Sequence, residues 1–312
     1  MKSFFYGVLV CLFLTQATAQ NKTAIKQVSS GINFNCVLFT NGQLKCFGEN
    51  GVGQLGIGDT RDRGISKSDM GAALPFLNFG ANEPVTMIST GDNFGCLVFQ
   101  SGKLKCWGNN GAGQLGLGDT TSRGTRASDM GANLPYVDLG VTQKIAGVSN
   151  GTAHACAWFE DGRVKCWGEN GSGQLGFGDT VDRGATNAQM GANLPFVDLG
   201  LGEKAIDVKT GTAFSCALLQ SGKVKCWGEN ANGQLGYGDA NDRGAQPNQM
   251  GASLPFVSLG KGVAALSLSI GDSHVCALTS FATVKCWGNN AYGQVGAGTT
   301  GSWATTPQNV TG

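Results

Sequence analysis

The segment Cys36 to Gly58, CVLFTNGQLKCFGENGVGQLGIG, recurs five times along the chain at a constant spacing. Its counterparts begin at Cys96, Cys156, Cys216 and Cys276, always 60 residues after the preceding one and without insertion or deletion. A fixed period of this length is typical of repeat architectures, in which each unit buries its apolar surface against its neighbours. The sequence therefore predicts one domain of five equivalent units.

Each repeat contains a predicted β-hairpin. In CAWFEDGRVKCWG, which starts at Cys156, two apolar runs flank a short turn that ends in Gly. A three-residue loop requires Gly last, because that position is left-handed. With this loop the two cysteines of a repeat face each other at a separation that suits a disulfide. We therefore predict the pairs Cys36–Cys46, Cys96–Cys106, Cys156–Cys166, Cys216–Cys226 and Cys276–Cys286.

The cysteine pattern has one irregular repeat and one rival interpretation. The fifth repeat has Ser280-Phe281-Ala282 where the others have a triplet ending in Gly, so its loop is expected to differ. A zinc site is the rival interpretation of paired cysteines, but the chain has no Cys-x-x-Cys and only two histidines, His154 and His274. Disulfides are favoured, and no metal or other cofactor is predicted.

The N-terminus indicates export. Met1 to Ala19 has a lysine, an apolar run and a small-residue cleavage site, as in a secretory signal peptide. Its removal takes Cys11 with it and leaves ten cysteines, all inside the repeats. We expect a secreted protein whose residues 20–312 form a single domain in an oxidising compartment. Four sequons could carry N-linked glycans in a eukaryotic host: Asn21, Asn150, Asn170 and Asn309.

The remaining pattern predicts an all-β, five-bladed β-propeller of four-stranded blades. A strand candidate such as Val85 to Ser89 precedes each hairpin, and an LPF-type segment such as Leu74 to Phe79 comes before that strand. Both faces of the strands are apolar, as a sheet packed between two others requires. The first repeat lacks a preceding LPF segment, so we expect the tail Thr306–Val310 to supply its missing strand and close the ring.

The motif W-G-x-N-x-x-G-Q-L-G resembles the repeat of the regulator of chromosome condensation family. It appears here as Trp107-Gly108-Asn109-Asn110 followed by Gly113-Gln114-Leu115-Gly116, and in phase in the other repeats. The resemblance implies a β-propeller of four-stranded blades. The family's nuclear founder has seven blades and acts on a nuclear GTPase. That activity is not carried over to a chain with a signal peptide and five disulfides. The family is also similar to a secreted propeller that inhibits β-lactamases, which implies that an extracellular member can bind proteins.

Several recurring residues are explained most simply by structure. Phe occupies the slot of His154 and His274 in the other repeats, which favours packing over catalysis. The tryptophan of C-W-G, for example Trp167, suggests a core between blades more than a platform for sugars. The glutamines of G-Q-L-G, for example Gln174, are expected to satisfy backbone groups between blades.

The strongest surface candidate is the loop that follows G-Q-L-G, which carries an Asp and an Arg in four repeats. These residues are Asp59, Arg63, Asp119, Arg123, Asp179, Arg183, Asp239 and Arg243. Each loop leads into an extra Met-Gly-Ala-x-Leu-Pro segment, and we call these loops and segments together the insert-bearing rim. An internal turn cap with a surface ion pair is the alternative explanation. Calcium is a weaker candidate, because the D-x-[DN]-x-[DN]-G loop is absent.

The function that follows is binding, not catalysis. No nucleophile elbow, phosphate loop or HExxH motif occurs in the sequence. A net charge of +1 gives no basic surface for nucleic acid. We expect a secreted propeller that recognises an extracellular protein or glycan through the insert-bearing rim. The alternatives are an enzyme with a site in the central channel and a structural matrix or wall protein.

Overall fold

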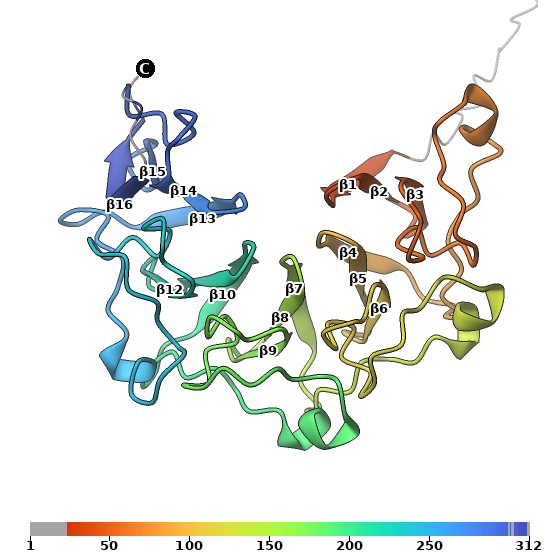
Figure 1. Cartoon of the computed structure of the whole chain (residues 1–312), viewed down its shortest axis with the longest axis horizontal. Helices are drawn as coiled ribbons and strands as arrows, with labels where there is room; N and C mark the ends of the chain where they lie inside the picture. Colours follow the sequence, from red (N-terminus) through yellow and green to blue (C-terminus); the bar gives the residue numbers. More distant parts are fainter. Residues whose placement is uncertain (1–23, 299, 301–302, 311–312) are drawn as a thin grey trace, which may run out of the picture.

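The structure is a computed structural model that describes residues 24–298, 300 and 303–310, so the predicted signal peptide and Asn21 lie outside the described residues. Five antiparallel sheets follow one another, one for each repeat. Figure 1 shows them side by side around a common centre, as an arc that is open between the first and the last sheet. The predicted all-β class and the count of five units are confirmed.

All five blades share three strands in the same order from the centre outward. The inner strands are β1 (Ile25–Ser30), β4 (Val85–Thr90), β7 (Ile145–Asn150), β10 (Ala205–Thr210) and β13 (Ala265–Ile270). The middle strands are β2 (Phe34–Phe39), β5 (Phe94–Phe99), β8 (His154–Phe159), β11 (Phe214–Leu219) and β14 (His274–Thr279). The third strands are β3 (Leu44–Gly48), β6 (Leu104–Gly108), β9 (Val164–Gly168), β12 (Val224–Gly228) and β15 (Val284–Asn289).

The hairpin between the middle and third strands has the predicted register. Cys36 lies opposite Cys46, and each of the five predicted cysteine pairs forms a disulfide. Gly42 closes the first loop with a φ of 79°. Ala282 takes the same left-handed place in the fifth loop, with a φ of 57°. The expectation of a different fifth loop is therefore wrong, because flanking hydrogen bonds impose this conformation even on Ala.

The LPF-type segments correct the predicted four-stranded blade. Each segment runs beside the third strand of the blade that precedes it and makes one backbone hydrogen bond to it, such as Leu77 N to Leu44 O at 2.9 Å. The first four sheets consequently have three strands each. Pro75 and its counterparts have no N–H to donate, which accounts for the broken ladder. We call these outer segments: 74–79, 134–139, 194–199 and 254–259.

The prediction that the C-terminal tail belongs to the first blade is also wrong. It forms β16 (Trp303–Asn309), which pairs with β15 and makes the fifth sheet four-stranded. Val310 N donates to Val284 O, the bond equivalent to that of Leu77 in the first blade. The tail therefore replaces the outer segment that the fifth repeat lacks. Within the described residues no strand pairing joins the first and fifth sheets, so the expected closure by this strand is not found.

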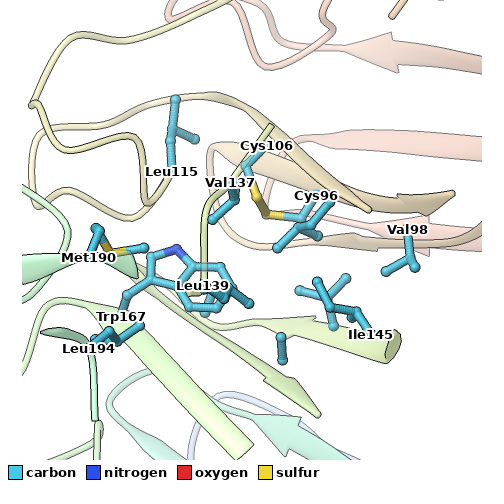
Figure 2. Close-up of a cluster of buried hydrophobic side chains, with 14 of the residues drawn as sticks. Cys96, Val98, Cys106, Leu115, Val137, Leu139, Ile145, Trp167, Met190 and Leu194 are labelled. Atoms are coloured by element: carbon cyan, nitrogen blue, oxygen red, sulfur yellow. A yellow bond between two sulfur atoms is a disulfide. The ribbon is translucent and has the colours of Figure 1, made fainter. Parts of the chain in front are cut away.

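The hydrophobic core lies between successive blades. Figure 2 shows one such layer, in which the Cys96–Cys106 disulfide, Val98 and Ile145 pack near Trp167. The indole N–H of Trp167 donates to the carbonyl of Gln114 in the preceding blade at 2.9 Å. Trp107, Trp227 and Trp287 repeat this bond, which confirms the predicted core role of the tryptophans. No helix in the described part of the chain has the length and apolarity to cross a membrane.

Candidate functional site

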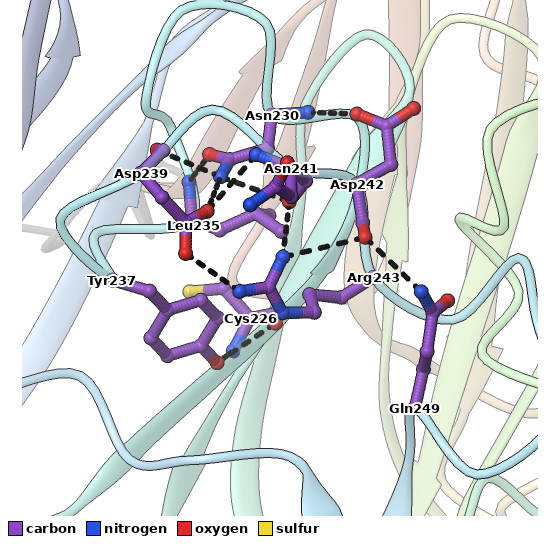
Figure 3. A network of polar contacts seen from close by, with 9 residues as sticks. All are labelled: Cys226, Asn230, Leu235, Tyr237, Asp239, Asn241, Asp242, Arg243 and Gln249. Atoms are coloured by element: carbon purple, nitrogen blue, oxygen red, sulfur yellow. Dashed lines mark hydrogen bonds and ion pairs between the residues drawn. The ribbon is translucent and has the colours of Figure 1, made fainter.

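The Asp and Arg side chains of the rim form a network inside their own loop (Figure 3). Arg243 pairs with Asp239 at 2.7 Å. The side chain of Asn230 donates to Asp239 and accepts from Leu235 N, and its backbone N–H donates to Asp242 at 2.7 Å. The loop is thus held through hydrogen bonds that its own residues supply.

The same network recurs in the other three loops. The pairs Asp59–Arg63, Asp119–Arg123 and Asp179–Arg183 lie 2.6 to 2.7 Å apart. Burial tends to raise the pKa of Asp59, but hydrogen bonds from Arg63 and from the backbone of Arg61 hold that pKa below its usual value. The arginine side chains are largely buried, with 10 to 19% exposed. The geometry matches the alternative explanation, a turn cap with an ion pair.

The extra segments of the rim link neighbouring repeats. They contain short 3₁₀ turns: η1 (Lys67–Asp69), η2 (Ala127–Asp129), η3 (Gly131–Asn133), η4 (Asn187–Gln189), η5 (Gly191–Asn193) and η6 (Gly251–Ser253). Gly131 N donates to Asn78 O in the outer segment of the preceding blade. The buried Lys105 Nζ donates to Phe79 O at 2.6 Å and to Gly131 O at 3.1 Å. Lys165 and Lys225 repeat this clamp, which sequence reasoning missed.

Three equivalent grooves lie where an outer segment meets the insert of the next repeat. Their volumes are about 300, 500 and 440 Å³. Each has a Gly, an apolar side chain, a Pro-aromatic pair and a Met at equivalent positions. The aromatic residues are Phe76, Tyr136 and Phe196, and the methionines are Met130, Met190 and Met250. The in-phase Pro-aromatic pairs were the sequence signal for these grooves.

Lysine ammonium groups lie over the aromatic rings that line the grooves. The ammonium groups of Lys103 and Lys105 lie 5.0 and 4.6 Å from the ring centroid of Tyr136, within the range of a cation–π contact. Desolvation lowers the pKa of Lys105. A polar group also lines each groove: Asn78, Asp138 or Asp198. Each groove thus combines an aromatic ring and a methionine with polar groups, as ligand sites commonly do.

A second concave site lies at the centre of the arc. A cavity of about 350 Å³ is lined by the residues that follow all five inner strands. Asp92 and Asp272 are the carboxylates of this lining, and Thr152 and Thr212 contribute hydroxyl groups. Desolvation and repulsion by Asp272 raise the pKa of Asp92, although a hydrogen bond with Thr152 opposes the shift. The described residues contain no group of three or more side chains suited to a metal ion.

The histidines and the glutamines singled out in the sequence have structural roles. His154 is fully buried and His274 is half-buried, in the slot that Phe fills elsewhere. The glutamine side chains accept from backbone N–H groups two residues earlier, so the expected bonds lie mainly within one turn and not between blades.

The described sequons occupy contrasting positions. Asn170 is fully buried and donates to Asp179, and Asn150 is buried beside Ser89. A glycan on either side chain does not fit this fold. Asn309 is exposed on β16, where a glycan is sterically allowed.

The repeats match the sequence profile described as the regulator of chromosome condensation (RCC1) repeat. The matches cover residues 25–54, 85–114, 145–174, 205–234 and 266–294, and a second profile of that description covers 161–218 and 221–278. The chain belongs to the RCC1 repeat family.

The similar proteins are longer than this chain. It is 29% identical over 293 residues to the ultraviolet-B receptor UVR8 of Arabidopsis thaliana, covering 91% of this chain and 58% of the receptor. It is 30% identical over 270 residues to the probable human E3 ubiquitin-protein ligase HERC6, covering 86% of this chain and 24% of the ligase. The chain therefore spans little more than half of the first of these relatives and a quarter of the second.

Solved structures confirm the fold of the chain. Human WBSCR16 matches with a TM-score of 0.67 at 20% identity, over 93% of this chain and 68% of that one. Prp20p of Saccharomyces cerevisiae, studied for its binding to Gsp1p and histones, matches with a TM-score of 0.67 at 18% identity, over 92% and 63%. At these identities the likeness concerns the propeller fold alone.

Proposed function

We propose that this chain is an extracellular binding module that recognises a protein or a glycan through its insert-bearing rim. The observation that carries the proposal is the threefold recurrence of one groove at the outer circumference. Ligand sites are typically concave and place a few polar groups beside apolar side chains, often on loops held by a rigid scaffold. The related receptor and the Gsp1p- and histone-binding Prp20p support a binding role by analogy.

The redox state of the cysteines supports an extracellular location. Four of the five disulfides are fully buried and the fifth, Cys276–Cys286, is partly buried; each cross-links a hairpin that a reducing compartment would leave without this bond. The signal-peptide pattern of Met1 to Ala19 agrees with this location. Both features belong to the same proposal of a secreted chain.

The spacing of the grooves favours an extended ligand. Equivalent residues recur every 60 positions, so a ligand with a repeating chemistry contacts each groove in the same way. Several weak contacts joined in one ligand raise the overall affinity well above that of a single groove. We propose that the Asp–Arg pairs serve recognition by fixing the loops next to the grooves.

The test compares the grooves with the central cavity. We expect Phe76→Ala, Tyr136→Ala and Phe196→Ala together to weaken binding at least about tenfold, on a panel of defined soluble polysaccharides and purified secreted proteins. Asp92→Asn with Asp272→Asn is the matched control and should leave binding unchanged. Thermal melts establish that both variants are folded. If the cavity variant alone loses the ligand, the rim proposal fails and a channel site, including the enzyme alternative, is favoured.

A further inference from the structure

The cavity at the centre of the arc (Figure 1) is lined by three consecutive residues from each repeat, at the end of each inner strand. The middle residue of each triplet is a glycine: Gly31, Gly91, Gly151, Gly211 and Gly271. A Cβ on Gly91 would lie 2.2 Å from Gly151 O, and a Cβ on Gly151 would lie 2.3 Å from Gly211 O. Neighbouring loops therefore pack backbone against backbone, and the cavity wall is formed before any ligand arrives.

The lining of the cavity is negatively charged. Asp92 is half-buried and Asp272 is exposed, and no lysine, arginine or histidine is among the described lining residues. Neither carboxylate takes part in an ion pair within the described residues. Desolvation raises the pKa of Asp92, and repulsion by Asp272 adds to this shift against the bond with Thr152. The two carboxylates are thus near enough to interact.

The histidine behind this lining does not offset its charge. The ring of His274 lies against Gly271. Desolvation lowers the pKa of His274, although the charge of Asp272 opposes the shift, so the imidazole is neutral at pH 7. A ligand is therefore the group that can neutralise the two carboxylates.

Asn150 adds an unpaired acceptor to the lining. It is 7% exposed, and its Nδ2 donates to Ser89 O at 2.9 Å. Because a carbonyl only accepts, this bond fixes the orientation of the amide, and the buried Oδ1 is left without a partner in the described part of the chain. Thr90 and Thr210 occupy the equivalent positions and bond to a serine, so the spare acceptor is particular to this repeat. A buried acceptor without a donor costs free energy, which a donor on a ligand recovers.

We propose that the central cavity binds a small organic diamine, whose ammonium groups pair with Asp92 and Asp272 and donate a hydrogen bond to Asn150 Oδ1. An ammonium group has three donors and no acceptor. It therefore matches a lining that offers carboxylates, an amide oxygen and the hydroxyl groups of Thr152 and Thr212. Ion pairs in a partly enclosed site are also stronger than those in bulk water.

The size and composition of the cavity favour an organic cation over a metal ion. Its volume of about 350 Å³ is far larger than an ion needs and lies at the lower end of small-molecule sites. The described residues contain no group of three or more side chains suited to a metal ion. The two carboxylates come from different blades, which favours a ligand with two charges over a ligand with one.

Isothermal titration calorimetry of the whole chain with 1,4-diaminobutane tests the proposal. The matched ligands are butylamine, which has a single ammonium group as a lysine side chain has, and 1,4-butanediol, which has none. We expect butylamine to bind at least about tenfold more weakly than the diamine, and the diol not to bind. Added salt should weaken binding of the diamine, because it screens the charges.

Three variants test the named residues. Asp92→Asn and Asp272→Asn should each weaken binding of the diamine at least about tenfold. Asn150→Thr should weaken it about threefold, because a threonine there bonds to the neighbouring serine and leaves no spare acceptor. The control is Asp161→Asn, which removes the same charge from the turn between β8 and β9, where the first repeat has Asn41. The control should keep the Kd of the wild type, and thermal melts establish that every variant is folded.

The proposal is overturned if the diamine does not bind, if butylamine or the diol binds as tightly, or if the two aspartate variants keep the wild-type Kd. Binding of calcium in place of the diamine would make the cavity a metal site and would also overturn it. The rim function is tested separately. Asp92→Asn with Asp272→Asn should lose the diamine and keep the rim ligand, whereas the triple aromatic variant of the grooves should do the reverse.

Discussion

His154 is a buried ionisable side chain in a slot that three other repeats fill with Phe. Ser215 Oγ donates to Gln174 O, so it accepts the proton of His154 Nε2 at 3.0 Å, and Nδ1 is left without a partner. Desolvation lowers the pKa of His154 to about 4 from 6.5. The folded state therefore holds a neutral imidazole at any pH well above 4.

The lowered pKa of His154 predicts that the free energy of unfolding decreases in acid. Between pH 6.5 and about 4 the unfolded chain binds more protons at this histidine than the folded chain, so stability falls as pH falls through that window. The loss approaches about 3 kcal/mol below the window. We expect His154→Phe to remove this component in denaturant unfolding at pH 7 and pH 4. His274→Phe, at the half-buried counterpart, should have a smaller effect; an unaltered pH dependence in His154→Phe contradicts the prediction.

Ala282 is a non-glycine residue in a left-handed turn, where the equivalent residue of the other hairpins is Gly. A Cβ disfavours this conformation, so Ala282→Gly should stabilise the protein by about 1 kcal/mol. The reverse change, Gly222→Ala, should destabilise it by more, because the new Cβ would lie 2.6 Å from Ala264 Cβ. Chemical denaturation measures both changes. Equal stabilities of Ala282→Gly and wild type would refute the strain argument.

The lysine clamp is a link between three elements of the fold. Lys225 Nζ donates to Leu199 O at 2.8 Å and to Gly251 O at 2.7 Å, and so joins a third strand, an outer segment and an insert. Lys225→Met keeps the apolar stem but leaves two inward carbonyls without their donor. We expect a loss of about 2 to 4 kcal/mol in unfolding free energy.

The matched control for the clamp is Lys223→Met. Lys223 lies over the same Phe256 ring, at 4.2 Å against 4.8 Å for Lys225, but it is exposed. The control should change stability by less than about 1 kcal/mol. Similar losses in both variants would mean that the ring contact, and not the carbonyl bonds, supplies the stabilisation.

At the scale of elements, sequence reasoning succeeded where local rules decide. Loop length and a terminal Gly determined the hairpin register, and the register determined the Cys36–Cys46 pairing. It failed for the outer segments, because periodicity shows that Leu74 to Phe79 recurs but not which neighbour it joins. The tail was misplaced for the same reason, since Val310 follows the fifth hairpin as Leu77 follows the first.

The candidate site was harder to predict than the fold. The sequence draws attention to Asp239 and Arg243, which pair with each other inside their own loop, and their part in binding stays a prediction. It gave no reason to single out Lys105, because a lysine in a strand is usually solvated, and only the folded arrangement brings its carbonyl partners together. The grooves combine segments from two repeats, so no single motif contains them.

At the scale of the whole molecule, the arc has two ends. A blade inside it packs on two neighbours, and an end blade packs on one, as the buried β8 and the partly exposed β2 and β14 show. In repeat proteins stability depends on contacts between neighbouring units, so the ends open more readily than the middle.

Hydrogen exchange should reveal this gradient. In dilute solution we expect the amides of β7 to β9 to exchange at least about tenfold more slowly than those of β1 to β3 and β13 to β15. Mass spectrometry of peptides from the five equivalent hairpins provides an internally matched comparison, because their sequences and registers are alike. Equal protection of all five hairpins in dilute solution would contradict the open arc, since a closed ring gives every blade two neighbours.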